Sequence, residues 1–226
     1  MPSPNHQIHA PGKKLFRTKK TTREAARIGF LELLLLILLG LGVIFGILLM
    51  TGDPFYSFSE KAPGSTYNDF DSLIENAARQ YDLEPELIKA LIWQESRFDP
   101  AAVGKAGERG LMQVMEPAAS DWVEAKKISA FQPTDLFDAK TNIDAGTWYL
   151  ARAIRNHKDK KNPLPFALAE YNAGRTRVKE WLKKIGADAD AEKFMTAIEF
   201  PTTLNYVENI LARREFYIRK NEFPKK

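Results

Sequence analysis

Apolar residues recur at helical spacing along most of the chain, from Tyr67 onward. They return every three or four positions, and no segment shows the strict alternation that marks a half-buried strand. The spacing of Ile143, Gly146, Leu150 and Ile154 predicts one long helix, in which the glycine lets another helix approach closely. The pattern therefore predicts an all-α, or mainly α, domain.

The N-terminal part of the chain has a different pattern. Leu33–Met50 is an uncharged run of eighteen residues without a polar face. A bilayer crossing needs roughly twenty such residues, so the run predicts a single transmembrane helix. A cleaved signal peptide is the alternative. The long basic leader and the lack of a small-x-small cleavage site in Leu48–Asp53 favour an uncleaved anchor.

These patterns divide the chain into four parts. The basic leader is expected to stay in the cytoplasm by the positive-inside rule, which places the folded domain on the other side of the membrane. For a bacterial chain, this means a single-pass protein of the inner (cytoplasmic) membrane with its domain on the periplasmic side. The expected parts are a cytoplasmic tail at 1–28, the anchor at 29–50, a Gly-, Pro- and Ser-containing linker at 51–66, and a helical domain at 67–226.

Charge and composition exclude several classes of function. The net charge is +4, but residues 1–28 carry +6, which leaves −2 for the remainder. A nucleic-acid partner is not expected, because the folded domain lacks a basic surplus. The chain has no cysteine, which removes disulfides and thiol nucleophiles. No metal or cofactor is expected either, because two of the three histidines lie in the tail.

One apolar stripe ends in a carboxylate. Ile88, Leu91 and Ile92 share a helix face, and the next position on that face is Glu95. Burial disfavours the charged form of a carboxyl and raises its pKa, as a general acid at neutral pH requires. The alternative is that Glu95 has turned into solvent, or pairs with a base such as Arg97. This helix alone favours the alternative.

Three short motifs follow one another in the chain. Glu95–Pro100 has the sequence Glu-Ser-Arg-Phe-Asp-Pro, in which the proline is expected to end the helix. Gly110–Gln113 is Gly-Leu-Met-Gln, and Tyr171–Gly174 is Tyr-Asn-Ala-Gly. Each motif is weak alone, but three in this order within about eighty residues are a specific signal. They resemble the catalytic domain of the soluble lytic transglycosylases, relatives of goose-type lysozyme, over about Tyr67 to Tyr217.

The resemblance implies a lysozyme-like helical domain with a sugar-binding cleft. It also implies an enzyme that cleaves the MurNAc-GlcNAc β-1,4 bond of peptidoglycan without water, leaving 1,6-anhydro-MurNAc ends. Glu95 would protonate the bond and then act as a base on the sugar's 6-hydroxyl, while the substrate's N-acetyl group replaces a second carboxylate. Tyr206 would hydrogen-bond Glu95. The match assigns substrate contacts to Ser96, Gln113, Tyr171 and Asn172.

Plainer interpretations of these residues stay open. Ser96 fits a cap at the helix end, and Gln113 fits a loop residue that satisfies backbone groups. Tyr171 and Tyr206 fit amphipathic core positions. Without the resemblance, the plainer interpretations are preferred for Gln113 and the two tyrosines.

The chain departs from the family pattern near the expected site. Gly104 stands where the family commonly has Ser, and Glu108 where it has Ala, so the source of the contact to the N-acetyl group is open. Glu170 replaces a small residue before the Tyr-Asn pair. It would be a second carboxylate if it pointed into the cleft, and a solvated helix position if it pointed outward, which is the favoured alternative.

Two other functions are carried alongside the transglycosylase. One is a true hydrolase of the goose-type lysozyme kind, and the other is a catalytically inactive wall-binding module. All three share peptidoglycan glycan strands as the partner, with the N-terminal helix holding the chain to the membrane. Wall-remodelling machinery is a further candidate partner.

Overall fold

The computed structural model describes residue 33 and residues 35–43 and 66–224 of the chain. The chain splits into two compact units, Met1–Pro54 and Phe55–Lys226. In the first, residues 35–43 are helical and exposed. None of the described helices combines the length and the apolar character that a membrane crossing requires. Most of the expected anchor at 29–50 lies outside the described residues, and the anchor stays a prediction.

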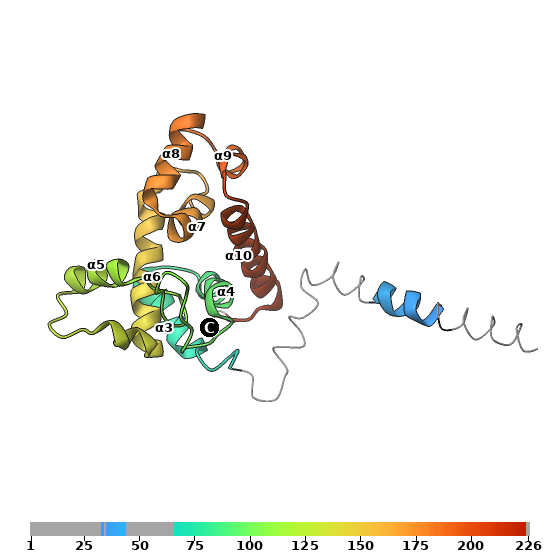
Figure 1. The fold of residues 1–226 in the computed structure, drawn as a ribbon, viewed down its shortest axis with the longest axis horizontal. Helices are drawn as coiled ribbons and strands as arrows, with labels where there is room; N and C mark the ends of the chain where they lie inside the picture. Colours follow the sequence, from blue (N-terminus) through green and yellow to red (C-terminus); the bar gives the residue numbers. More distant parts are fainter. Residues whose placement is uncertain (1–32, 34, 44–65, 225–226) are drawn as a thin grey trace, which may run out of the picture. The chain divides into compact units, whose positions relative to one another are not determined.

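The second unit is built from α-helices (Figure 1). Within the described residues it has no strand, only two isolated bridges that tie Arg109 to Val103 and to Val114. The all-α prediction is confirmed for this part of the chain. Its helices are α3 (Asp71–Tyr81), α4 (Pro85–Ser96), α5 (Glu116–Lys126), the 3-10 helix η1 (Pro133–Phe137), α6 (Ala139–Asn156), α7 (Leu164–Ala173), α8 (Arg175–Ile185), α9 (Ala191–Ala197) and α10 (Pro201–Lys220).

Helix α4 lies inside this unit. Pro85 occupies its first turn, where a missing N–H costs nothing, and its residues 87–92 are all buried. The helix ends at Ser96, earlier than Pro100 was expected to end it, because Arg97 and Phe98 take left-handed backbone angles of φ 55° and 64°. This turn buries Phe98 edge-on against a neighbouring aromatic ring.

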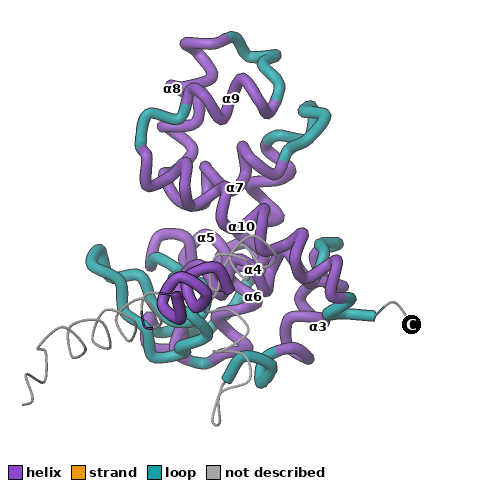
Figure 2. The backbone as a smooth tube through the Cα atoms, turned by 90° about the vertical axis from the view of Figure 1, so that its right-hand side faces the viewer, coloured by secondary structure: helices purple, strands orange, loops and turns teal. Residues whose placement is uncertain are grey.

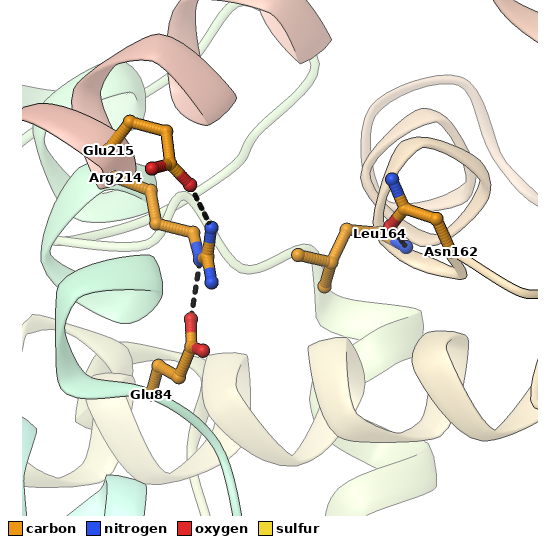
Figure 3. Close-up of polar contacts among 5 residues, drawn as sticks. All are labelled: Glu84, Asn162, Leu164, Arg214 and Glu215. Atoms are coloured by element: carbon orange, nitrogen blue, oxygen red, sulfur yellow. Dashed lines mark hydrogen bonds and ion pairs between the residues drawn. The ribbon is translucent and has the colours of Figure 1, made fainter. Parts of the chain in front are cut away.

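Helix α10 packs along α4 and α7. An ion pair holds the outer side of this contact, where Arg214 of α10 bonds Glu84 just before α4 and also its own neighbour Glu215 (Figure 3). Helices α8 and α9 lie side by side at the end of the unit opposite α3 (Figure 2). The long contact between α4 and α10 brings the C-terminal turn of α4 next to the start of α10.

Helix α6 matches the expected long helix. Asp138 caps its start by accepting a 2.8 Å hydrogen bond from the Thr141 N–H. Gly146 is buried, and a Cβ added there would lie 2.6 Å from the Met112 sulfur. The glycine therefore admits the side chain of a loop residue. The expectation that another helix approaches Gly146 is corrected in this respect.

Candidate functional site

Glu95 lies in the last turn of α4, and two features hold that turn in place. The Ser96 hydroxyl donates 2.8 Å to the Leu111 carbonyl, with a weaker 3.3 Å contact to Ile92. The left-handed angle at Arg97 then stops the helix, so the chain turns away directly after the acid. The shorter bond of the Ser96 hydroxyl thus joins the helix end to the following loop, instead of capping the helix as the plainer interpretation expected.

The Glu95 carboxyl is shielded from water at the end of an apolar stripe. Burial raises its pKa from the ordinary 4.5 to about 7, a hydrogen bond from Tyr206 opposes this rise, and the negative charge of Glu108 adds to it. Near neutral pH, a substantial fraction of Glu95 therefore carries a proton. The Arg97 guanidinium lies over the Trp93 ring and bonds the Trp93 carbonyl, and Arg97 is not among the groups that shift the pKa of Glu95.

Tyr206 and Tyr171 approach Glu95 from two different helices. The Tyr206 hydroxyl donates to Glu95 Oε1 at 2.5 Å, and the Tyr171 hydroxyl donates to the Met112 carbonyl at 2.8 Å. Burial raises the pKa of both phenols, and the charge of Glu95 raises it further. Both tyrosines therefore stay neutral and act as hydrogen-bond donors around the acid.

The loop between α4 and α5 places Gln113 beside these tyrosines. Its amide nitrogen donates to the carbonyls of Gly110 at 2.9 Å and Ala102 at 3.2 Å, as the plainer interpretation expects. Gln113 nevertheless also lines a small hollow of about 60 Å³, together with Tyr149 and Tyr171. This hollow is concave and partly aromatic, which suits contact with a sugar ring or an acetamido group.

Asn172 lies on the exposed side of α7. Its side-chain oxygen accepts a 2.7 Å hydrogen bond from the Thr203 hydroxyl at the start of α10. Asn172 therefore ties α7 to the helix that supplies Tyr206. It can also meet a ligand, because the residue remains exposed.

Glu170 lies away from both environments expected for it. It is buried, with 2% exposure, and its two carboxyl oxygens bond Asn156 at 2.7 Å and His157 at 2.9 Å, at the end of α6. Neighbouring residues on a helix project about 100° apart, so Glu170 faces this cluster while Tyr171 faces the loop. The expected solvated position is wrong, and the geometry gives no support to a second carboxylate at this position.

Two residues that shape the site were missed in the sequence. Buried Asn142 holds the loop through three bonds of 2.7 Å, accepting from Met112 N–H and donating to the Arg109 and Leu136 carbonyls. Tyr149 packs edge-on against Tyr171, with ring centroids 5.4 Å apart. An amide in the first turn of a helix, next to the apolar stripe that begins at Ile143, was the available signal for Asn142.

The larger hollow in this unit lies elsewhere, and the described residues offer no metal-binding cluster. A larger hollow of about 520 Å³ contains none of the candidate residues, since it lies between residues 159–162 and 188–192. Among the described residues, no group of three or more His, Cys, Asp or Glu side chains is arranged to hold a metal ion.

Comparison with known proteins adds independent information. A family model described as "Transglycosylase SLT domain" matches residues 72–194. The chain is 35% identical over 152 residues to the soluble lytic murein transglycosylase of Salmonella typhimurium, covering 67% of this chain and 23% of that one. It is 34% identical to the membrane-bound lytic murein transglycosylase F of Desulfosudis oleivorans, covering 66% of this chain and 30% of that one.

A solved structure agrees with these relatives. The 70 kDa soluble lytic transglycosylase SLT70 of Escherichia coli superposes with a TM-score of 0.62 at 31% identity, covering 67% of this chain and 24% of that chain. The chain thus spans between about a quarter and a third of the length of these relatives. Because the family model covers more than half of its residues, this chain belongs to the transglycosylase SLT domain family.

Proposed function

We propose that this chain is a peptidoglycan lytic transglycosylase that cleaves the MurNAc-GlcNAc β-1,4 bond and leaves 1,6-anhydro-MurNAc ends. The observation that carries the proposal is the state of Glu95, a shielded carboxyl with a pKa of about 7 that is held by a neutral tyrosine. Such a group can donate a proton and take one back at the same pH. The names of the relatives support the substrate.

The proposed reaction uses Glu95 twice. It first donates its proton to the glycosidic oxygen while the bond from that oxygen to C1 breaks, so the departing sugar leaves with a hydroxyl. The N-acetyl carbonyl of the MurNAc ring supports the positive charge at C1. The Glu95 carboxylate then accepts the proton of the 6-hydroxyl, whose oxygen bonds to C1 and closes the anhydro ring. Glu95 ends protonated, and no water is consumed.

The surrounding residues serve this cycle in different ways. Tyr206 holds one Glu95 oxygen and stabilises the carboxylate between the two steps, because its hydrogen bond favours the charged form. Gln113 and Tyr171 line the hollow that would receive part of the sugar. Asn172 orders the start of α10 through Thr203, and its exposed side chain would be accessible to the glycan strand.

A hydrolase on the same scaffold predicts different products, which gives a direct test. The full chain would digest purified wall sacculi in water enriched in ¹⁸O, and the muropeptides would be analysed by mass spectrometry. Anhydro ends without ¹⁸O are expected. Reducing ends that carry ¹⁸O would instead establish hydrolysis. A wall-binding module would leave the sacculi intact, and Glu95→Gln would then behave like the wild type.

We also propose that residues 29–50 anchor the chain in the inner membrane, with the domain on the periplasmic side. The apolar run, the basic leader and the membrane-bound relatives support this location. The full-length chain should stay in the membrane fraction after an alkaline carbonate wash. Protease added to spheroplasts should digest the domain. Recovery of a shorter, washable chain would favour a cleaved signal peptide.

A further inference from the structure

A tight turn in the loop between α4 and α5 folds an acidic side chain back on itself. The Gly104 N–H donates to the Glu108 carbonyl at 2.8 Å, and Gly107 allows the reversal with φ of +90°. The Glu108 side chain then returns across the turn, and its Oε2 accepts a 2.9 Å hydrogen bond from the Ala106 N–H. Its carboxylate is therefore held at a defined place.

Gly104 provides the space for this carboxylate. Its backbone is not left-handed, so conformation does not require glycine there. A Cβ added at Gly104 would lie 2.2 Å from Glu108 Oε2 and 2.9 Å from Gln113 Oε1. The carboxylate therefore takes the place that a side chain at position 104 would fill, next to the amide oxygen of Gln113.

The second oxygen of the Glu108 carboxylate is available to a ligand. Within the described residues, Oε1 of Glu108 has no hydrogen-bond partner, and it is not among the buried unsatisfied atoms. A solvent-facing carboxylate oxygen beside an amide oxygen offers two acceptors to a sugar that presents N–H or O–H groups. No positive side chain is recorded in an ion pair with this carboxylate, so its charge is not neutralised in the described part of the chain.

We propose that Glu108, whose carboxylate fills the space that Gly104 leaves open, is a second carboxylate of the site. It binds an N–H or hydroxyl donor of the sugar held beside Gln113. The inference rests on the proposed function for the location of the sugar. The two departures from the family pattern then compensate for each other. Gly104 lacks the serine side chain that the family commonly has, and Glu108 supplies a polar group in its place.

The electrostatics of the site agree with this role. In the described part of the chain, the titratable groups that interact with Glu95 are Tyr206 from α10, Tyr171 from α7 and Glu108 from the loop. The two tyrosines are neutral, so Glu108 supplies the negative charge that faces the acid.

Four single variants of the full chain in detergent test the proposal. Glu108→Gln removes the charge but keeps the shape, and Glu108→Ala removes the carboxylate. Gly104→Ala displaces the carboxylate and also crowds Gln113 Oε1. A glutamate tip is flexible, so Gly104→Ala should fold, which circular dichroism would check. Glu124→Gln, an exposed carboxylate on α5, is the matched charge control. The readouts are the affinity for an N-acetylglucosamine oligomer, by tryptophan fluorescence, and the pH profile of kcat/KM on sacculi.

The proposal predicts a specific pattern. Gly104→Ala and Glu108→Ala should each weaken oligomer binding roughly tenfold, as expected for a lost charge-assisted hydrogen bond. The double variant should bind little more weakly than either single variant, because both substitutions remove the same contact. Glu108→Gln should move the alkaline limb of the pH profile to lower pH, because Glu95 loses a repelling charge. A cello-oligosaccharide, which has hydroxyls in place of acetamido groups, shows which donor is bound.

The result that overturns the proposal is also clear. If Glu108→Ala binds the oligomer as tightly as Glu124→Gln does, Glu108 has no part in the site, whatever Gly104→Ala does. Failure of the proposed function looks different, since the wild type would then leave sacculi uncut or release reducing ends that carry ¹⁸O. The binding comparison would still decide the role of Glu108 in that case.

Discussion

The Tyr206 hydroxyl lies 2.5 Å from Glu95 Oε1, although 111 residues separate the two in the chain. The pair exists because α10 packs along α4, and the first turns of α10 meet the last turn of α4. The contact sets the proton affinity of the acid, since burial raises the pKa of Glu95 and this hydrogen bond lowers it. The buried phenol of Tyr206 thus stabilises the carboxylate form of Glu95, which is the form that acts as the base in the proposed second step.

Replacing Tyr206 by phenylalanine should therefore raise the pKa of Glu95 above about 7. The alkaline limb of the kcat profile should move to higher pH, because the acid form persists longer. The maximal rate should fall by roughly tenfold, since the carboxylate formed in the first step loses its donor. Muropeptide release across pH 5 to 9 would measure both effects, and an unchanged profile would sink this role of Tyr206.

Glu95→Gln should abolish activity and stabilise the fold at alkaline pH. Below pH of about 4.5, both the folded and unfolded chains hold this proton. Between that pH and about 7, only the folded chain holds it, so the free energy of unfolding falls as pH rises. The full cost above pH 7 is up to about 3 kcal/mol, at about 1.4 kcal/mol per pKa unit.

The substituted amide avoids that cost, because it cannot ionise. Urea unfolding at pH 4 and pH 8.5 should therefore show similar stability in acid and a more stable variant in base. Wall digestion should fall by at least roughly a hundredfold. Glu124→Gln provides the control on α5, where the carboxylate is exposed. Equal stability of Glu95→Gln and wild type at pH 8.5 would contradict the raised pKa.

Asn142→Asp should disrupt the loop that carries Gln113. The side-chain nitrogen of Asn142 donates to two carbonyls, at Arg109 and Leu136, and a carboxylate there would face both without a proton to offer. Leaving buried polar groups unsatisfied costs about 1–3 kcal/mol each. We expect a large loss of thermal stability and of substrate binding, measured by circular dichroism and sacculus binding. Asn162→Asp, on an exposed loop, is the control.

Lys89→Met should destabilise the domain without touching the site. The Lys89 ammonium is fully buried, and it pairs with Asp71 at 2.8 Å and Glu222 at 2.9 Å. Removing it leaves two partly buried carboxylates without their cation, which costs about 3 kcal/mol. The melting temperature should fall by several degrees, while exposed Lys183→Met should leave it unchanged. An unaltered melting temperature for Lys89→Met would show that the three-residue cluster contributes little.

Much of the secondary structure and the position of the acid were readable in the chain itself. The apolar spacing of α4 and α6 is a local property, because a helix repeats every 3.6 residues. The same spacing placed Glu95 at the end of a buried face. The motifs around Glu95, Gln113 and Tyr171 identified the family, since short-range order along the chain carries that signal without any knowledge of packing.

What the sequence alone determined is therefore the helical class, the family and the residue most suited to acid chemistry. The tertiary structure decided the rest. Glu170 was expected either at the cleft or in solvent, and it lies instead in a buried pair with His157. The influence of the Glu108 charge on Glu95, like the bond between Tyr206 and Glu95, comes from the packing of loop and helices. Such contacts join residues distant in the chain, and side-chain spacing along one helix carries no information about which partner from another element will face it.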